Sequence, residues 1–96
     1  MQVFVSEEAD SDLLKTLAYL AERNPSVARS LAQEFASKFE SLTRFPFIGR
    51  DRSHLLPGLR SVVAARHVVF YRVDQDRITV VRVLDGRRDI DAEFPR

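Results

Sequence analysis

The sequence predicts an α+β fold in which a helix hairpin packs on one face of a mainly antiparallel four-stranded sheet. Two segments with apolar residues at helical spacing fill the first half of the chain. Runs of β-branched residues between short polar turns fill the second half. The length of 96 residues suits one modest core, and no linker-like or repeated tract divides it. We therefore expect a single domain over residues 1–96, with elements in the order β-α-α-β-β-β.

The first strand and helix follow from local signals near the N-terminus. Residues 2–5 have the composition of a short strand, and Ser6 then offers a hydroxyl that can cap a helix. Negative charge from Glu7 and Glu8 in the first turn complements the helix dipole. The apolar residues that follow lie on one helical face: Ala9, Leu13, Leu17, Leu20 and Ala21. A helix ending near Arg23 is predicted.

A second helix is predicted directly after the first. Asn24 suits a helix cap and Pro25 suits the first helical position, where its missing N–H costs nothing. Phe45 and Pro46 mark the end of this helix. Its apolar stripe consists of Ala28, Leu31, Phe35, Phe39 and Leu42. Because the connection is short, the two helices are expected to pack antiparallel.

The rest of the chain is predicted to form a loop and three strands. Residues 47–58 combine glycine, proline and charge and are expected to be irregular. Strands are predicted over residues 60–64, 67–73 and 78–84, with a tight turn at 74–77 that makes the last pair antiparallel. The helices should cover one face of the sheet and leave the other partly open. The predicted core includes Leu13, Leu17, Leu20, Leu31, Phe35, Phe39, Val69 and Val81.

Composition excludes several kinds of site. The absence of cysteine removes disulfides, thiolate nucleophiles and cysteine-based zinc sites. His54 and His67 lack a second histidine at metal-ligand spacing, so neither a metal nor a cofactor is expected. No uncharged apolar run approaches the ~20 residues that cross a bilayer. Residues 1–6 do not have the pattern of a signal peptide, so the cytoplasm is the expected location and no membrane partner is expected.

Positive charge is concentrated in the second half of the chain. Residues 1–48 hold five Lys/Arg against seven Asp/Glu, whereas residues 49–96 hold ten against seven. Every basic residue of the second half is arginine, whose planar fork suits carboxylate or phosphate and is enriched at interfaces. An anionic partner is therefore expected for this half. The net charge of +1 is too small for a protein whose main task is to coat nucleic acid.

Four segments carry a resemblance to a known family. SEEADSDLLKTLAYLAERNP, RFPFIGRDR, LPGLRSV and RHVVFYRVDQDRITVVRVLDGRRD, in that order, resemble the ParE toxins of the RelE/ParE superfamily over nearly the whole chain. The resemblance implies a RelE/ParE-like fold and the toxin of a type II toxin–antitoxin system, of the kind that serves plasmid stabilisation. It implies growth inhibition by poisoning DNA gyrase and blocking replication. A ParD-like antitoxin would neutralise the toxin, and DNA would be contacted only indirectly, through antitoxin or gyrase.

The same resemblance directs attention to charged residues of the second half. No catalytic residue is expected, and the candidate partner-binding residues are Arg60, Arg66, Arg82, Arg87, Arg88 and Asp89. Two simpler alternatives stay open: the last three could form a solvated turn with a weak ion pair, and Arg82 could be paired across strands. One departure concerns position 85, where the family often has histidine and this chain has Asp85.

Two other functions remain open at this stage. One is the RelE activity of the same superfamily, cleavage of messenger RNA on the ribosome, which needs a proton acceptor, a proton donor and cations on the phosphate. No lysine follows Lys38, and Phe94 stands where RelE-like toxins carry a tyrosine, so only Arg88 matches that site. The other is a degenerate superfamily member that binds antitoxin without toxicity.

Overall fold

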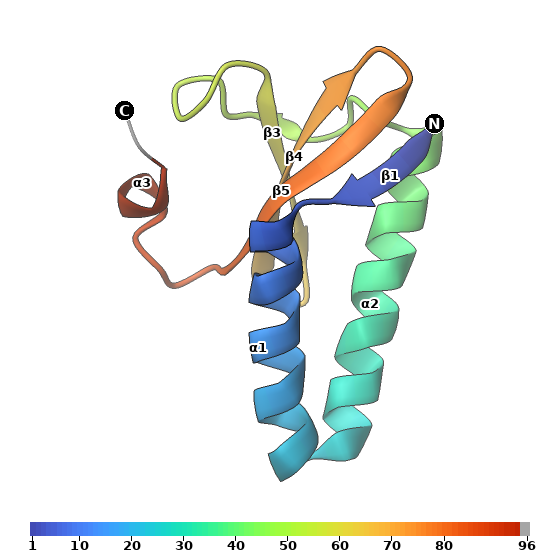
Figure 1. Cartoon of the computed structure of the whole chain (residues 1–96), viewed down its shortest axis with the longest axis vertical. Coiled ribbons are helices and arrows are strands. Elements are labelled where there is room, and N and C mark those ends of the chain that lie inside the picture. The colour runs from blue at the N-terminus through green and yellow to red at the C-terminus, as the bar shows by residue number, and fades with distance from the viewer. Residues whose placement is uncertain (95–96) are drawn as a thin grey trace.

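The computed structural model describes residues 1–94 and confirms a helix hairpin packed on a mainly antiparallel sheet (Figure 1). The elements are β1 (Gln2–Val5), α1 (Glu7–Arg23), α2 (Pro25–Arg44), β2 (Arg50–Asp51), β3 (Leu59–Ala64), β4 (His67–Asp74), β5 (Arg77–Asp85) and α3 (Ile90–Glu93). The strand order is β1-β5-β4-β3-β2, with β1 parallel to β5 and the other neighbours antiparallel. No helix within residues 1–94 has the length and apolar character of a membrane span.

The predicted helix caps are present. The Ser6 hydroxyl accepts a hydrogen bond from the Ala9 N–H at 3.1 Å, and the Asn24 side chain accepts one from the Val27 N–H at 3.3 Å. Pro25 occupies the first turn of α2, as its fixed φ favours. These local bonds satisfy N–H groups that have no partner inside a helix, which is why the helix starts could be located from sequence.

The sheet contains one strand more than the four expected. β2 has two residues, pairs with Ser61 and Arg60 of β3, and lies within the segment expected to be irregular. The short helix α3 was not predicted either. The other strands begin and end within one residue of the predicted positions. β2 and α3 are both too short to show a periodic sequence pattern, so only their hydrogen bonds in the folded chain identify them.

The core on the helix side of the sheet contains most of the predicted residues. Leu31, Phe35 and Val69 are buried there. Leu13, Leu17, Leu20 and Phe39 are partly buried and pack against the same cluster. The two helices thus cover this face with their apolar stripes, as expected for two packed layers.

Val81 lies on a different face from the one that simple alternation predicts. Tyr71 pairs with Val80 and Phe70 pairs with Arg82, so Val81 is an extra residue in β5 and forms a bulge. Val80 and Val83 consequently both face the helices, whereas Val81 packs against the cluster on the other side. Strict alternation along β5 would place Val81 and Val83 on one face, and the bulge separates them.

The face away from the helices is covered over part of its area. The segment that follows β2 and the short helix α3 bury a second cluster there: Leu55, Leu59, Val68, Phe70, Leu84 and Phe94. The rings of Phe70 and Phe94 meet edge to face with centroids 4.9 Å apart. Phe70 and Tyr71 point to opposite faces, and both are fully buried. Phe4 of β1 is 41% exposed, so part of the sheet remains open.

Candidate functional site

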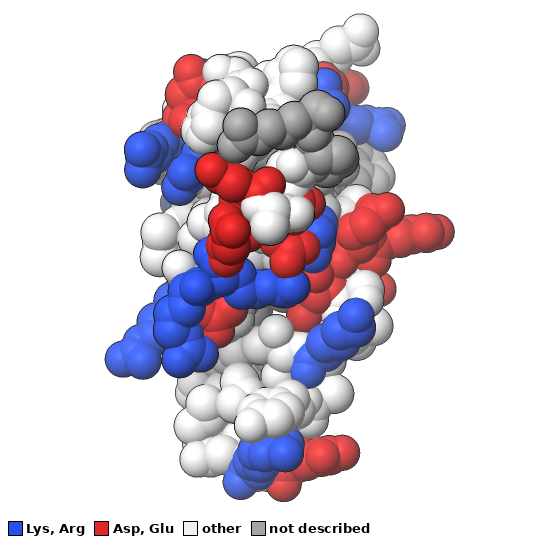
Figure 2. All heavy atoms as spheres, turned by 90° about the vertical axis from the view of Figure 1, so that its left-hand side faces the viewer, with Lys and Arg blue, Asp and Glu red and all other residues white. Residues whose placement is uncertain are grey.

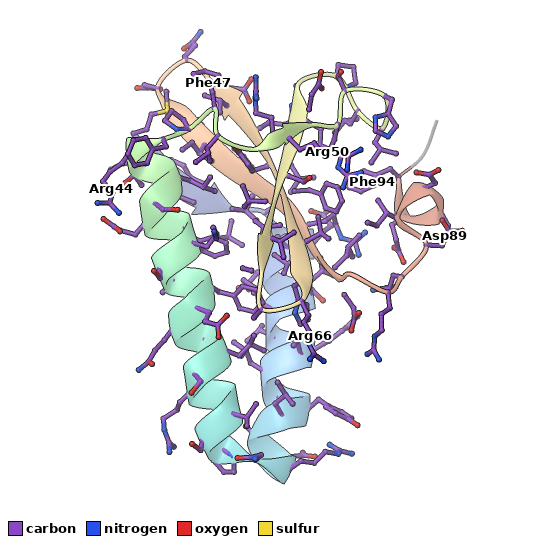
Figure 3. All side chains as sticks on the ribbon, turned by 180° about the vertical axis from the view of Figure 1, so that it is seen from behind. Arg44, Phe47, Arg50, Arg66, Asp89 and Phe94 are labelled. Atoms are coloured by element: carbon purple, nitrogen blue, oxygen red, sulfur yellow. The ribbon has the colours of Figure 1, made fainter. Side chains whose placement is uncertain are left out.

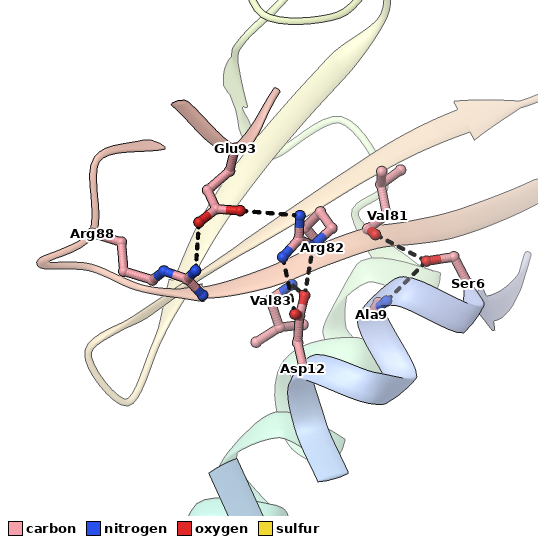
Figure 4. A network of polar contacts seen from close by, with 8 residues as sticks. All are labelled: Ser6, Ala9, Asp12, Val81, Arg82, Val83, Arg88 and Glu93. Atoms are coloured by element: carbon pink, nitrogen blue, oxygen red, sulfur yellow. Dashed lines mark hydrogen bonds and ion pairs between the residues drawn. The ribbon is translucent and has the colours of Figure 1, made fainter. Parts of the chain in front are cut away.

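The start of α1 closes the edge of β5 beyond the end of β1. Ser6 donates from its N–H to the Val80 carbonyl at 2.9 Å and from its hydroxyl to the Val81 carbonyl at 2.9 Å. Asp12, one helical turn and a half further on, accepts from the Val83 N–H at 2.9 Å. Ser6, the residue that caps α1, and Asp12 within α1 thereby satisfy edge groups of β5 that a longer β1 would otherwise pair (Figure 4).

An ion-pair network continues from this edge. The Asp12 carboxylate accepts two hydrogen bonds from the Arg82 guanidinium, at 2.8 and 3.1 Å. Arg82 also contacts Glu93 of α3 at 3.4 Å, and Glu93 pairs with Arg88 through its other oxygen. Hydrogen bonding to Asp12 raises the pKa of Arg82 above its ordinary value. The network ties α1, β5 and α3 together (Figure 4), and acidic and basic side chains lie side by side on this face (Figure 2).

Arg87 is held by its own turn. Its backbone N–H and two guanidinium nitrogens donate to the Asp85 carboxylate at 2.9, 3.2 and 3.1 Å. These bonds lower the pKa of Asp85 to about 2. The Arg87 side chain is 92% exposed, so the guanidinium is presented to solvent in a fixed direction. Asp85, the residue that departs from the family pattern, therefore orients this arginine.

A groove lies between the helix hairpin and the turn that joins β3 to β4. It has a volume of about 720 Å³, and its lining includes Leu20, Val27 and Leu31 on the helices and Arg66, Asp85 and Arg87 opposite them. A neighbouring hollow of about 500 Å³ shares Leu20, Asp85 and Arg87 and continues along α1 toward Arg82 and Arg88. The helix wall also carries Ser30 and Glu34, so the groove combines apolar side chains from the helices with charged side chains on both walls. A groove of this mixed character suits an amphipathic partner.

The structure separates the six predicted partner-binding residues. Arg66 and Arg87 line the groove, while Arg82 and Arg88 belong to the network beside it. Arg60 lies on β3, four residues before the end of the strand at Ala64, which corresponds to about 13 Å at the rise of an extended strand, and Arg66 lies in the turn beyond. Asp89 is exposed at the start of α3 and makes no side-chain cap bond (Figure 3). The six residues do not form one cluster.

Sequence reasoning missed the carboxylates that control these arginines. Asp12 and Glu93 are far from Arg82 in sequence, and the Asp12 pairing spans 70 residues. One signal was available, because Asp12 lies one turn after Ala9 and beside Leu13, on the flank of the buried stripe. An acid in that position requires a buried partner. Within the described residues, no cluster of His, Cys, Asp and Glu suits a metal ion.

Comparison with known proteins identifies the family. The family described as "ParE toxin of type II toxin-antitoxin system, parDE" matches residues 3–90. The chain belongs to the ParE toxin family. It is 33% identical to Toxin ParE3 of Caulobacter vibrioides over 94 residues, which is 97% of this chain and 94% of that protein. It is 37% identical to Toxin ParE1 of Mycobacterium tuberculosis over 65 residues, 67% of this chain and 66% of that protein.

A solved structure shares the ParE-family fold of this chain. That structure, described as "Chromosomal ParDE TA system from P. aeruginosa", superposes with a TM-score of 0.74 at 19% identity. The match covers 88% of this chain and 95% of the other. The helix hairpin on a mixed sheet is therefore an architecture that a solved structure also has.

Proposed function

We propose that this ParE-family toxin blocks replication by binding DNA gyrase, without catalysing a reaction, and that a ParD-like antitoxin neutralises it. The family match over residues 3–90 carries this proposal. The structurally similar protein from P. aeruginosa belongs to a system named ParDE, which supports an antitoxin of the ParD kind as partner. The cytoplasm, where gyrase acts, is the location that the proposal requires.

The groove is the proposed antitoxin site. Leu20, Val27 and Leu31 offer an apolar wall, and Arg66 and Arg87 offer exposed cations beside it. An amphipathic helix with apolar residues on one face and acidic residues along its border would complement both features. Arg87 suits such a contact because its side chain is 92% exposed and lines the groove beside Leu20.

The remaining predicted residues have different proposed roles. Asp89 is exposed beside the groove-lining turn and could contact either partner. Arg82 and Arg88 stay predicted partner-binding residues, but their guanidiniums are held by Asp12 and Glu93. We expect substitution of Arg82 to act mainly through stability.

Two observations support a mechanism without catalysis. Phe94, at the position where RelE-like toxins carry a tyrosine, is 6% exposed and packs on Phe70, so it offers no group for proton transfer. Arg88, the cation that matches a RelE arginine, is already paired with the Glu93 carboxylate. A ribonuclease requires free cations for the developing phosphate charge.

The proposal is tested by inducing the chain in cells with and without the neighbouring small gene and scoring growth and filamentation. Purified chain is then added to gyrase in a supercoiling and DNA-cleavage assay. Growth arrest with filamentation, relieved by the neighbouring gene, and trapped cleaved DNA are expected. Loss of protein synthesis with codon-linked messenger cleavage in a translating ribosome system would instead establish the ribonuclease function. Unchanged growth would indicate a degenerate member.

The antitoxin site is tested separately with charge reversals. Arg66→Glu together with Arg87→Glu should weaken the complex with the antitoxin on size-exclusion chromatography at micromolar concentration. Arg29→Glu, an exposed arginine on α2 without an ion pair among the described residues, is the matched control. A double variant that elutes with the antitoxin as the wild type does would place the antitoxin elsewhere.

A further inference from the structure

Three large apolar side chains project into solvent between α2 and β2. Phe45, Phe47 and Ile48 are 57%, 61% and 67% exposed. They lie at the end of the molecule where α2 finishes, together with Arg44, whereas the groove-lining Arg66 lies at the β3–β4 turn toward the other end (Figure 3). Grouped apolar side chains on a small soluble domain mark an interaction surface more often than chance exposure does.

The backbone under these side chains is anchored. The Gly49 N–H donates to the buried Tyr71 hydroxyl at 2.8 Å. Arg60 donates from one guanidinium nitrogen to the carbonyls of Phe47 and Gly49, at 3.1 and 3.0 Å. The Ile48 N–H donates to the Phe45 carbonyl at 3.3 Å. A fixed loop loses little conformational entropy when its side chains enter a partner, so this loop is preorganised for binding.

Positive charge borders the apolar side chains. The Arg60 guanidinium lies 5.1 Å from the centre of the Phe47 ring, and Arg50 is exposed in β2. Neither arginine forms an ion pair within residues 1–94. Asp51 lies opposite Arg60 in the β2–β3 pair, and its carboxylate accepts from the Ser53 N–H at 2.8 Å. Hydrogen bonding to Ser53 lowers the pKa of Asp51, and the nearby Arg60 charge adds to this effect. The surface therefore has an apolar centre and a cationic border.

We propose that Phe47 and Ile48 enter an apolar pocket on the toxin's protein target, and that carboxylates around that pocket pair with Arg50 and Arg60. This proposal rests on the proposed function, because it assigns the surface to the target. The antitoxin groove lies toward the opposite end of the molecule, so the two partners have separate primary sites. Aromatic residues with arginine beside them are the usual anchors of protein interfaces.

Two other occupants fit this surface less well. In a symmetric dimer through this surface, Arg50 and Arg60 of one copy would face the same two arginines of the other copy. Cations would then meet cations instead of carboxylates. Nucleic-acid surfaces are more polar and more densely positive, and Ile48 at the centre offers neither a hydrogen bond nor a stacking plane. A protein with an apolar pocket and an acidic border satisfies every group present.

The first test separates target binding from antitoxin binding. Phe47→Ser with Ile48→Thr should weaken growth inhibition roughly tenfold or more, as loss of an interface anchor does, while the melting temperature and the antitoxin complex stay unchanged. The matched control is Leu14→Ser with Val63→Thr, since these side chains are also 61% and 67% exposed and lie elsewhere. Equal growth inhibition by the two folded double variants would overturn the proposal. Loss of the antitoxin complex in the Phe47→Ser, Ile48→Thr variant but not in the control would overturn it too.

The second test identifies the occupant directly. A photoreactive benzoylphenylalanine in place of Phe47, or of Leu14 as control, is irradiated in cells and with purified gyrase subunits. A protein adduct specific to position 47, reproduced with the purified protein and reduced about tenfold by Arg50→Glu, is expected. An adduct to antitoxin, to a second copy or to nucleic acid, or none above the control, would overturn the proposal. If growth is unaffected by the wild-type chain, the proposed function fails, and the adduct still decides what this surface binds.

Discussion

Asp12 joins α1 to the edge of β5, and its removal tests how much the ion-pair network stabilises the fold. Its side chain is 13% exposed and that of Arg82 is 21% exposed, so both charges are largely removed from water. Asp12→Ala leaves the Arg82 guanidinium with only the 3.4 Å contact to Glu93. It also leaves the Val83 N–H without its acceptor.

The size of the effect follows from these contacts. Breaking a buried pair by removing one partner costs about 3–5 kcal/mol, and residual solvent access at this site reduces that figure. An unsatisfied backbone N–H adds about 1 kcal/mol or more. We expect Asp12→Ala to lower the free energy of unfolding by about 3 kcal/mol and the melting temperature by about 15 °C, given the usual scaling for a domain of this size. Asp12→Asn keeps one acceptor oxygen and should cost about half as much.

Urea denaturation and thermal melts measure both losses. Asp10→Ala is the matched control, because Asp10 is exposed on the same helix and its side chain forms no bond within residues 1–94. Its one contribution is a negative charge in the first turn of α1. It should cost about 0.5 kcal/mol through the helix dipole. A double-mutant cycle with Arg82→Met should give a coupling of at least about 1 kcal/mol. If Asp12→Ala is no more destabilising than Asp10→Ala, the network does not stabilise the fold.

Three further predictions concern the core, the turn and the anchored loop. Phe35→Ala should lower the free energy of unfolding by about 3–4 kcal/mol in urea melts, and a loss under about 0.5 kcal/mol would contradict its burial. The Asp85 carboxyl should titrate at about 2 by NMR. Because the folded pKa lies below the unfolded value near 4, the contribution of Asp85 to the free energy of unfolding is complete above pH 4 and disappears as the pH falls through 2. Arg87→Ala should bring that titration back toward 3.8, the ordinary value, and an unchanged midpoint would exclude the pairing. Gly49→Ala should cost about 2–3 kcal/mol, since the added Cβ would lie 2.5 Å from the Tyr71 hydroxyl; a neutral melt would mean that the buried ring can move.

The elements that sequence located correctly are those specified by neighbouring residues. Ser6 bonds to Ala9 and Asn24 bonds to Val27, so each helix start is encoded within four residues. β2 is different, because two residues have no period and the strand exists only through its bonds to β3. The bulge at Val81 changes which face a side chain takes, and no local residue type announces it.

The candidate site was predicted less completely than the fold, for a related physical reason. Residue type predicted arginine as the interface cation, but only tertiary structure decides which arginines already have a carboxylate. Asp12 and Glu93 reach Arg82 from α1 and α3, two elements whose relative position follows from packing. The groove is likewise assembled from both helices, the β3–β4 turn and the end of β5.

The excess of arginine in the second half is therefore distributed unevenly over the surface. At the β5 end, Arg82, Arg87 and Arg88 are each compensated by a carboxylate. At the β2–β3 end, Arg50 and Arg60 form no close ion pair among the described residues, and Asp51 is the carboxylate opposite Arg60 in the strand pair. A partner at the first end can pair with Arg66, but it must compete with the existing pairs of the other arginines there and gains mainly from the apolar side chains of the groove. A partner at the second end meets Arg50 and Arg60 without close ion pairs and gains apolar burial as well. Raised salt should consequently weaken target binding more than antitoxin binding, because charge contributes more at the β2–β3 end.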